Sequence, residues 1–323
     1  MAHQLTIRKD GTAEMAFTGD RGAIWHGLGN QLDDGADIDT WKKQAGMDWE
    51  VFQSAVSYQS MDGEHVFPKK QVLFRSDNKT PLSIVSNDYK IVQPGEVLEF
   101  FRDLTQLHGM KLSTAGTLFE GKRFWALAEI GKSFEIAKGD EVNGYLLLVT
   151  SVDGTLATQA RLTSTRVVCN NTLTVAIDGT AEKMVKVSHR QTWDPKAVKI
   201  DLDLVDHGWD KFRDSIEMLS EIRVSDDEVR SYFQKKFYMP EVPAEQQGWG
   251  ATKRVNELMA LYRNGTGSQY TEGTAWGIVN AATELFTHGS GRKGGSQQFW
   301  DSYFGTGDRM KNEVFHDMLE LAV

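Results

Sequence analysis

The pattern of apolar residues changes near Pro195, and this change limits the folds that the chain can adopt. Before it, segments rich in aromatic and β-branched residues are separated by turn signals at Asp62-Gly63, Glu120-Gly121 and Asp153-Gly154. This arrangement is typical of antiparallel hairpins. After it, apolar residues recur at alternating spacings of three and four, which is typical of amphipathic helices. We therefore expect an α+β fold, in which an antiparallel sheet with packed helices is followed by a helical carboxyl-terminal region.

Two helices are expected in the first part of the chain. Asp37 can cap a short helix that ends at Gly46. Pro94 suits the first turn of a longer helix that runs to His108, and Gly109 is a natural stop. The apolar stripe of this longer helix predicts that it packs on a face of the sheet; the stripe comprises Val97, Phe100, Phe101, Leu104 and Leu107.

The expected strands surround this longer helix. Three lie before it, at residues 49–58, 71–75 and 81–85, the last continued by an extended segment at 89–93. After it, residues 110–118 pair with 123–130, residues 145–151 pair with 155–162, and a final strand covers 183–189. Asn170-Asn171 interrupts residues 165–177, where periodicity does not decide between helix and strand.

The second part of the chain is expected to be helical. Its clearest helix runs from Leu202 to Leu219, and the apolar stripe of this helix suits a core, although its near-heptad spacing also allows a homo-oligomer contact. Ser225 and Glu228 match a capping box that opens the next helix. Later helices fit residues 251–263, 274–287 and 308–321, with a flexible basic loop at 289–295. The predicted domains are 1–36, 37–195 and 196–323.

Composition argues against several classes of protein. The single Cys169 cannot form an internal disulfide, and the eight histidines are scattered without the spacing of metal ligands. No segment resembles a signal peptide or approaches the roughly 20 apolar residues that cross a bilayer. The glycine-rich loop lacks the order of a phosphate-binding loop. We therefore expect a cytoplasmic protein without membrane, metal or cofactor, and no complete catalytic signature supports an enzyme.

Charge is unevenly distributed along a chain of net charge −9. Residues 156–200 hold seven basic residues against three acidic ones, whereas residues 201–245 carry a net negative charge. Clustered cations favour nucleic acid, and rings next to cations favour single strands, but a mixed solvated surface gives the same counts. The candidate nucleic-acid-binding residues are the cations beside Phe124-Trp125, those around a hydroxyl-rich stretch, and two near the last strand: Lys122, Arg123, Arg161, Arg166, Lys186 and Arg190.

Four local strings carry a family resemblance. They are residues 25–29, 85–93, 166–173 and 273–277, with Asn280, Ala281, Thr283 and Glu284 extending the last. The chain resembles a family of phage- and plasmid-encoded proteins that share the domain of unknown function 932, over nearly its whole length. The resemblance implies a mobile-element origin in a bacterial host, but the family has no activity to transfer to particular residues.

The order helix, three-stranded meander, helix at residues 37–108 is similar to the core of single-strand annealing proteins, which form rings with a basic groove. This similarity implies a homo-oligomer that binds single-stranded DNA. We therefore expect a DNA-binding protein of a mobile element that acts in recombination or annealing. A protein-interaction module that modulates a host factor, where acidic charge is an asset, is the main alternative, and an unrecognised hydrolase or nucleotide-modifying enzyme is the third.

Overall fold

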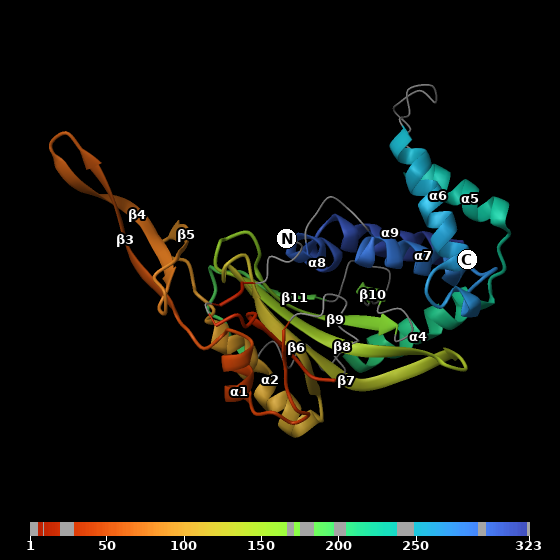
Figure 1. Cartoon of the computed structure of the whole chain (residues 1–323), viewed down its shortest axis with the longest axis horizontal. Coiled ribbons are helices and arrows are strands. Elements are labelled where there is room, and N and C mark those ends of the chain that lie inside the picture. Colours follow the sequence, from red (N-terminus) through yellow and green to blue (C-terminus); the bar gives the residue numbers. More distant parts are fainter. Residues whose placement is uncertain are drawn as a thin grey trace.

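A computed structural model shows an α+β fold with a large antiparallel sheet and a helical carboxyl-terminal region (Figure 1). The structure describes residues 6–8, 10–19, 29–166, 171–174, 184–196, 205–237, 249–289 and 295–321. The predicted fold class is therefore confirmed. The predicted strands and loops at residues 167–170, 175–183 and 290–294, and the string at 25–28, lie outside the described residues.

The large sheet has eight strands in the order β10-β9-β8-β7-β6-β1-β2, and β11 pairs with β9 beside β10. Every pair is antiparallel except β1 with β2. The bounds are β1 Met15–Phe17, β2 Asn30–Gln31, β6 Lys111–Leu118, β7 Arg123–Ala137, β8 Asp140–Ser151, β9 Thr158–Arg166, β10 Asn171–Thr174 and β11 Met184–Val187. The two hairpins predicted for residues 110–162 are confirmed, and a third, between β7 and β8, was not expected.

Helices cover both faces of this sheet. On one face, α1 (Ile38–Gln44) and α2 (Pro94–His108) pack over alternate residues such as Phe124 and Leu146. On the other face, α8 (Gly295–Phe304) covers Trp125 and Leu147. The central strands are therefore buried on both sides, which explains their nearly continuous apolar sequence.

The helix predicted from Pro94 to His108 is confirmed. Gly109 ends it in a left-handed conformation with φ of 67°, which glycine adopts without strain. Val97, Phe101 and Leu104 are buried against the sheet, as their spacing predicted. The extended segment at 89–93 is not a strand; it connects the turn at residues 87–88 to this helix.

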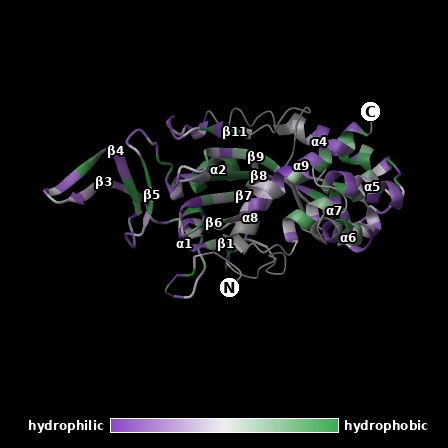
Figure 2. Ribbon diagram, turned by 90° about the horizontal axis from the view of Figure 1, so that it is seen from above, coloured by the Kyte–Doolittle hydropathy of each residue, from purple (hydrophilic) through white to green (hydrophobic). Residues whose placement is uncertain are grey.

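Three strands between α1 and α2 form a second, smaller sheet, which we call the arm. It has the order β3-β4-β5, with bounds Val51–Ser60, Gly63–Arg75 and Pro81–Ser86. The predicted order helix, meander, helix is thus present. The arm projects from the body at the end opposite the helical region (Figures 1 and 2).

The outer half of the arm has only two strands. Ala55 pairs with Gln71 and Ser57 with Val66, so β4 advances five residues where β3 advances two. Lys69 in this irregular segment has a φ of 60°. Because β5 pairs only with residues 70–74 of β4, residues 57–66 form a two-stranded distal hairpin without a third strand.

The carboxyl-terminal region consists of α4 (Val205–Glu221), α5 (Asp226–Phe237), α6 (Trp249–Asn264), α7 (Ala275–His288), α8 and α9 (Thr306–Glu320). Sequence analysis did not expect α8. Ser225 and Glu228 form the predicted capping box, with the Ser225 backbone N–H donating to the Glu228 carboxylate at 2.8 Å. The apolar stripe of α4 lies in the core, because Trp209, Phe212, Ile216 and Leu219 are all buried. This stripe therefore does not supply an oligomer contact.

Candidate functional site

The structure distributes the six predicted nucleic-acid-binding residues over three places: one end of the large sheet, the middle of β9, and the opposite end of β9. Lys122 and Arg123 lie at the start of β7, and Lys186 and Arg190 lie on and just after β11. We expect Arg161, Arg166, Lys186 and Arg190 to share a surface only if the strands near Leu162 and Val187 are neighbours, and they are, since β11 pairs with β9. Arg161 lies in the middle of β9, which places it under a helix.

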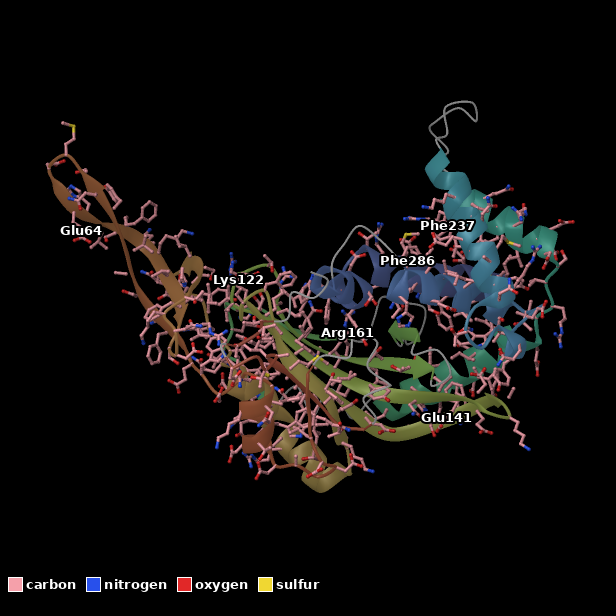
Figure 3. The ribbon with its side chains drawn as sticks, in the orientation of Figure 1. Glu64, Lys122, Glu141, Arg161, Phe237 and Phe286 are labelled. Carbon is pink, nitrogen blue, oxygen red and sulfur yellow. The ribbon has the colours of Figure 1, made fainter. Side chains whose placement is uncertain are left out.

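Arg161 does not lie on the surface, so the prediction that Arg161, Arg166, Lys186 and Arg190 share one surface is wrong at this position. Its guanidinium donates to the Asp308 carboxylate at 3.0 Å and to the Tyr303 carbonyl, and it stacks 4.2 Å from the Phe304 ring centroid. The Arg161 side chain is 3% exposed (Figure 3). The physical reason is that α8 and α9 cover this face of β9, and sequence analysis had no helix at α8.

Arg166 lies at the opposite end of β9 from Lys122. Its backbone pairs with Asn171 and Val142, at the end of the sheet where β8 begins. Lys122 lies where β8 ends, because the Val152 N–H donates to the Lys122 carbonyl at 2.8 Å. The side chain of Arg166 is outside the described residues. The backbone of Arg166 therefore lies at the end of the sheet opposite that of Lys122.

Arg123 is held by neighbours. Its Nη2 donates to Thr155 Oγ1 at 3.0 Å, its Nε lies 3.5 Å from Asp153 Oδ2, and its guanidinium carbon lies 3.8 Å from the Trp300 ring centroid. With 14% of its side chain exposed, Arg123 joins the β8–β9 connection to α8. It is therefore a structural residue with little surface for a ligand.

The remaining cations lie at one end of the large sheet. The Lys90 N–H donates to the His189 carbonyl at 2.7 Å, which places Lys90 beside Arg190. His189 Nε2 lies 3.0 Å from the Leu156 carbonyl. This links the segment after β11 to the β8–β9 connection that holds Lys122. We call Lys90, Lys122, Lys186 and Arg190 the sheet-end surface; Lys122 is half-buried and the other three are exposed.

Exposed apolar side chains gather on the arm. Six of the nine large apolar side chains that are exposed among the described residues lie there: Phe52, Tyr58, Met61, Val66, Phe67 and Ile84. They include every exposed aromatic side chain in that set. In a folded protein such a concentration of exposed apolar groups marks a surface that contacts another molecule.

Cations accompany these rings near the base of the arm. Lys79 Nζ lies 5.6 Å from the Phe52 ring centroid, and Lys69 and Lys70 follow Phe67 on β4. The acids Asp62 and Glu64 lie at the tip instead, where Figure 3 labels Glu64. The arm therefore has a basic aromatic base and an acidic apolar tip. These residues were not among the predicted binding residues, although the run Phe67-Pro68-Lys69-Lys70, an aromatic ring followed by two cations after an uncharged strand, indicates such a site.

The arm is fixed to the body by a buried ion pair. Arg75 Nη2 lies 2.7 Å from Glu14 Oε1, and both side chains are 3% exposed. The Thr117 hydroxyl donates to the same carboxylate, and the Arg75 guanidinium carbon lies 4.1 Å from the Trp49 ring centroid. These contacts join β4 to β1 and β6, so the base of the arm has a defined position beside the large sheet.

Lys311 is a buried cation that sequence analysis did not single out. It lies on α9 near Arg161 and Asp308, and the whole residue is 1% exposed. Burial, opposed by Asp308 and Asp301 and helped by Arg161, lowers its pKa to about 8. A buried lysine with a lowered pKa also occurs at functional sites, but here it is covered by α8, with its Nζ 5.8 Å from the Tyr303 ring centroid.

We expect the lowered pKa of Lys311 to make stability depend on pH. Below about pH 8, folded and unfolded chains both carry the proton, and the folded state bears the full cost of the buried charge. Between about pH 8 and 10.5, the folded state has lost the proton that the unfolded state retains, so the free energy of unfolding rises with pH. Denaturant unfolding of the wild type relative to Lys311→Met should show a rise of about 3 kcal/mol across this window. A difference between the two proteins that does not change with pH would contradict the assignment.

Among the described residues, no group of three or more His, Cys, Asp or Glu side chains is placed to hold a metal ion. No described helix combines the length and apolar character that crossing a membrane requires. The exposed chemistry of the arm and the sheet-end surface is instead that of aromatic rings and amines, which bind by stacking and by charge.

Comparison with known proteins identifies the family. The model of the Domain of unknown function (DUF932) matches residues 81–303, which run from β5 into α8. No curated protein and no solved structure matches the chain. The match covers more than half of the chain, so this protein belongs to the DUF932 family.

Proposed function

We propose that this protein binds single-stranded nucleic acid along the base of the arm and the sheet-end surface. The observation that carries the proposal is the arm itself, which holds all the exposed aromatic side chains of the described residues and places cations beside two of them. Single strands bind where bases stack on rings while amines neutralise phosphates. Among the described surfaces, this arrangement supplies both.

The sheet-end surface extends the proposed path from the arm onto the body. Lys122 lies next to the arm base, because the Arg75 guanidinium is within 3.5 Å of the Glu120 carbonyl (Figure 3). Lys90, Lys186 and Arg190 continue along the end of the sheet. Because the net charge of the chain is −9, the rest of the surface repels phosphate. The nucleic acid would therefore contact the protein along the arm base and the sheet-end surface. As a biological setting we propose recombination or annealing in a phage or plasmid, in line with the family resemblance.

The aromatic side chains give the first test. We expect the double change Phe52→Ala with Phe67→Ala to weaken binding of a labelled oligothymidylate, measured by fluorescence anisotropy at about 50 mM salt. Each lost stacking contact is worth about 1–3 kcal/mol, so the loss of two should lower affinity at least about thirtyfold. The matched control is Met218→Ala, which removes an exposed apolar side chain from α4. Equal losses in both variants would argue against stacking on the arm.

The cations give the second part of the same experiment. Lys186→Ala with Arg190→Ala should reduce the slope of log affinity against log salt by about 0.7 for each lost phosphate contact. Lys235→Ala removes an exposed cation from α5 at the far end of the molecule and should leave the slope unchanged (Figure 1). Absence of any binding by the wild type at low salt would refute the proposal.

The acidic apolar tip of the arm favours a second candidate function, binding of another protein. Met61 is fully exposed, and Val66 is 67% exposed without a neighbouring cation. A protein partner could cover these side chains, whereas nucleic acid would be repelled by Asp62 and Glu64. Failure of oligonucleotide binding, together with a folded arm, would make this candidate the leading one.

A further inference from the structure

Strand β3 has a free edge of a kind that folded proteins usually protect. It is an outer strand of the arm, with β4 as its sheet neighbour among the described strands. Its ten residues, Val51–Ser60, contain no charge and no proline. A long exposed edge without these features readily pairs with another strand.

The other side of the distal hairpin is protected. Where β4 extends beyond β5, it carries Pro68, which lacks an N–H to donate, followed by Lys69 with a positive φ. Proline and lysine are common means of blocking an edge. The contrast between the two edges leaves β3 as the edge that is open to pairing.

The inner end of this edge already has a partner, which shows the direction in which its backbone groups point. The Val51 N–H donates to Gln93 Oε1 at 2.8 Å, and Gln93 Nε2 donates to the Val51 carbonyl at 3.2 Å. Because alternate residues of a strand point their backbone groups to the same side, Gln53 and Ala55 also direct theirs away from β4. A further strand could therefore pair from Gln53 outward.

We propose that β3 pairs antiparallel with β3 of a second copy, so that two arms form one continuous sheet in the order β5-β4-β3-β3-β4-β5. Identical strands related by a twofold axis form a closed contact. An uncharged strand meets its own copy without like-charge repulsion in any register, which few edges allow. The arm projects from the body, so its edge is accessible to a second arm (Figure 1).

Pairing also accounts for the distal hairpin. An isolated two-stranded hairpin is only marginally stable in water, whereas three or more strands with apolar faces are stable. Within one copy, no described strand pairs with residues 57–66 as a third strand. Two hairpins joined at β3 make four strands, and the faces that carry Tyr58 and Phe67 stay open to a ligand. The inference goes beyond the proposed function and does not depend on it.

The test is a charge exchange measured by sedimentation velocity of the full chain. Ala55→Lys with Ser57→Lys should weaken the dimer about tenfold or more, because pairing from Gln53 outward sets the twofold axis near Val56 and like charges then face each other across it. Ala55→Glu with Ser57→Glu should do the same. An equal mixture of the two variants should recover a dimer, since opposite charges now face each other. Ile84→Lys is the matched control, because it charges an exposed residue of β5 on the other side of the arm and should leave the dimer intact.

Circular dichroism of each variant shows whether it is folded. Recovery in the mixture also excludes misfolding, because an unfolded chain would not regain a dimer. A wild-type chain that stays monomeric at about 100 µM, far above a typical micromolar affinity, would overturn the proposal. A dimer that survives both charge changes would overturn it as well, since the contact would then lie elsewhere.

Discussion

Replacing Arg75 by alanine is expected to lower the free energy of unfolding by about 3–5 kcal/mol, the usual cost of breaking a buried ion pair by removing one partner. The Glu14 carboxylate would stay buried without its two contacts to the guanidinium, at 2.7 and 3.1 Å. Only the Thr117 hydroxyl would still donate to it. Urea unfolding followed by circular dichroism measures the change.

Two further variants make this test specific. Asp77→Ala removes the more exposed partner of Arg75, whose side chain is 42% exposed, and should cost about 1 kcal/mol or less. Replacing both partners, Arg75→Met with Glu14→Leu, removes the stranded charge and should recover most of the stability. If the double variant is as unstable as Arg75→Ala, the loss comes from packing against Trp49 and the electrostatic explanation is wrong.

Arg161→Glu is expected to destabilise the protein by about 3–5 kcal/mol or more, whether or not the protein binds nucleic acid. The change places a carboxylate against Asp308, whose own carboxylate is 7% exposed. It also removes the donor to the Tyr303 carbonyl, so a buried acceptor loses a partner. Thermal and urea unfolding both measure this loss.

Arg190→Glu is the control, since the same charge reversal at an exposed site should change stability by no more than about 0.5 kcal/mol. A folded Arg161→Glu protein of wild-type stability would contradict the burial of Arg161. The comparison also shows why a loss of ligand binding in an Arg161 variant is not evidence of a contact. Unfolding alone would produce it, so the exposed cations are the informative positions.

Local signals predicted most elements, because they act over a few residues. Asp62-Gly63, Glu120-Gly121 and Asp153-Gly154 each marked a true strand connection. Pro94 and Gly109 marked both ends of α2. One element that was not predicted, α8, has two glycines near its start and a short sequence, so its helical state depends on contacts with Phe119 and the large sheet.

The candidate site was predicted less well, because exposure is a long-range property. Arg161 and Lys186 look alike in sequence, and both lie on neighbouring strands. A helix more than a hundred residues later covers Arg161 and leaves Lys186 exposed. Likewise, β3 and β6 are both strands with apolar residues, but of the two only β6 is covered by helices.

The sequence by itself determined the family, the α+β class, the strand connections and the extent of α2, since composition, turns and periodicity are properties of short segments. Only the tertiary structure decided that the meander forms a separate arm, that Arg161 is buried and that the α4 stripe belongs to the core. These depend on which surfaces meet when the chain folds. Burial of apolar area between distant segments drives that choice, and a local pattern does not specify the partner.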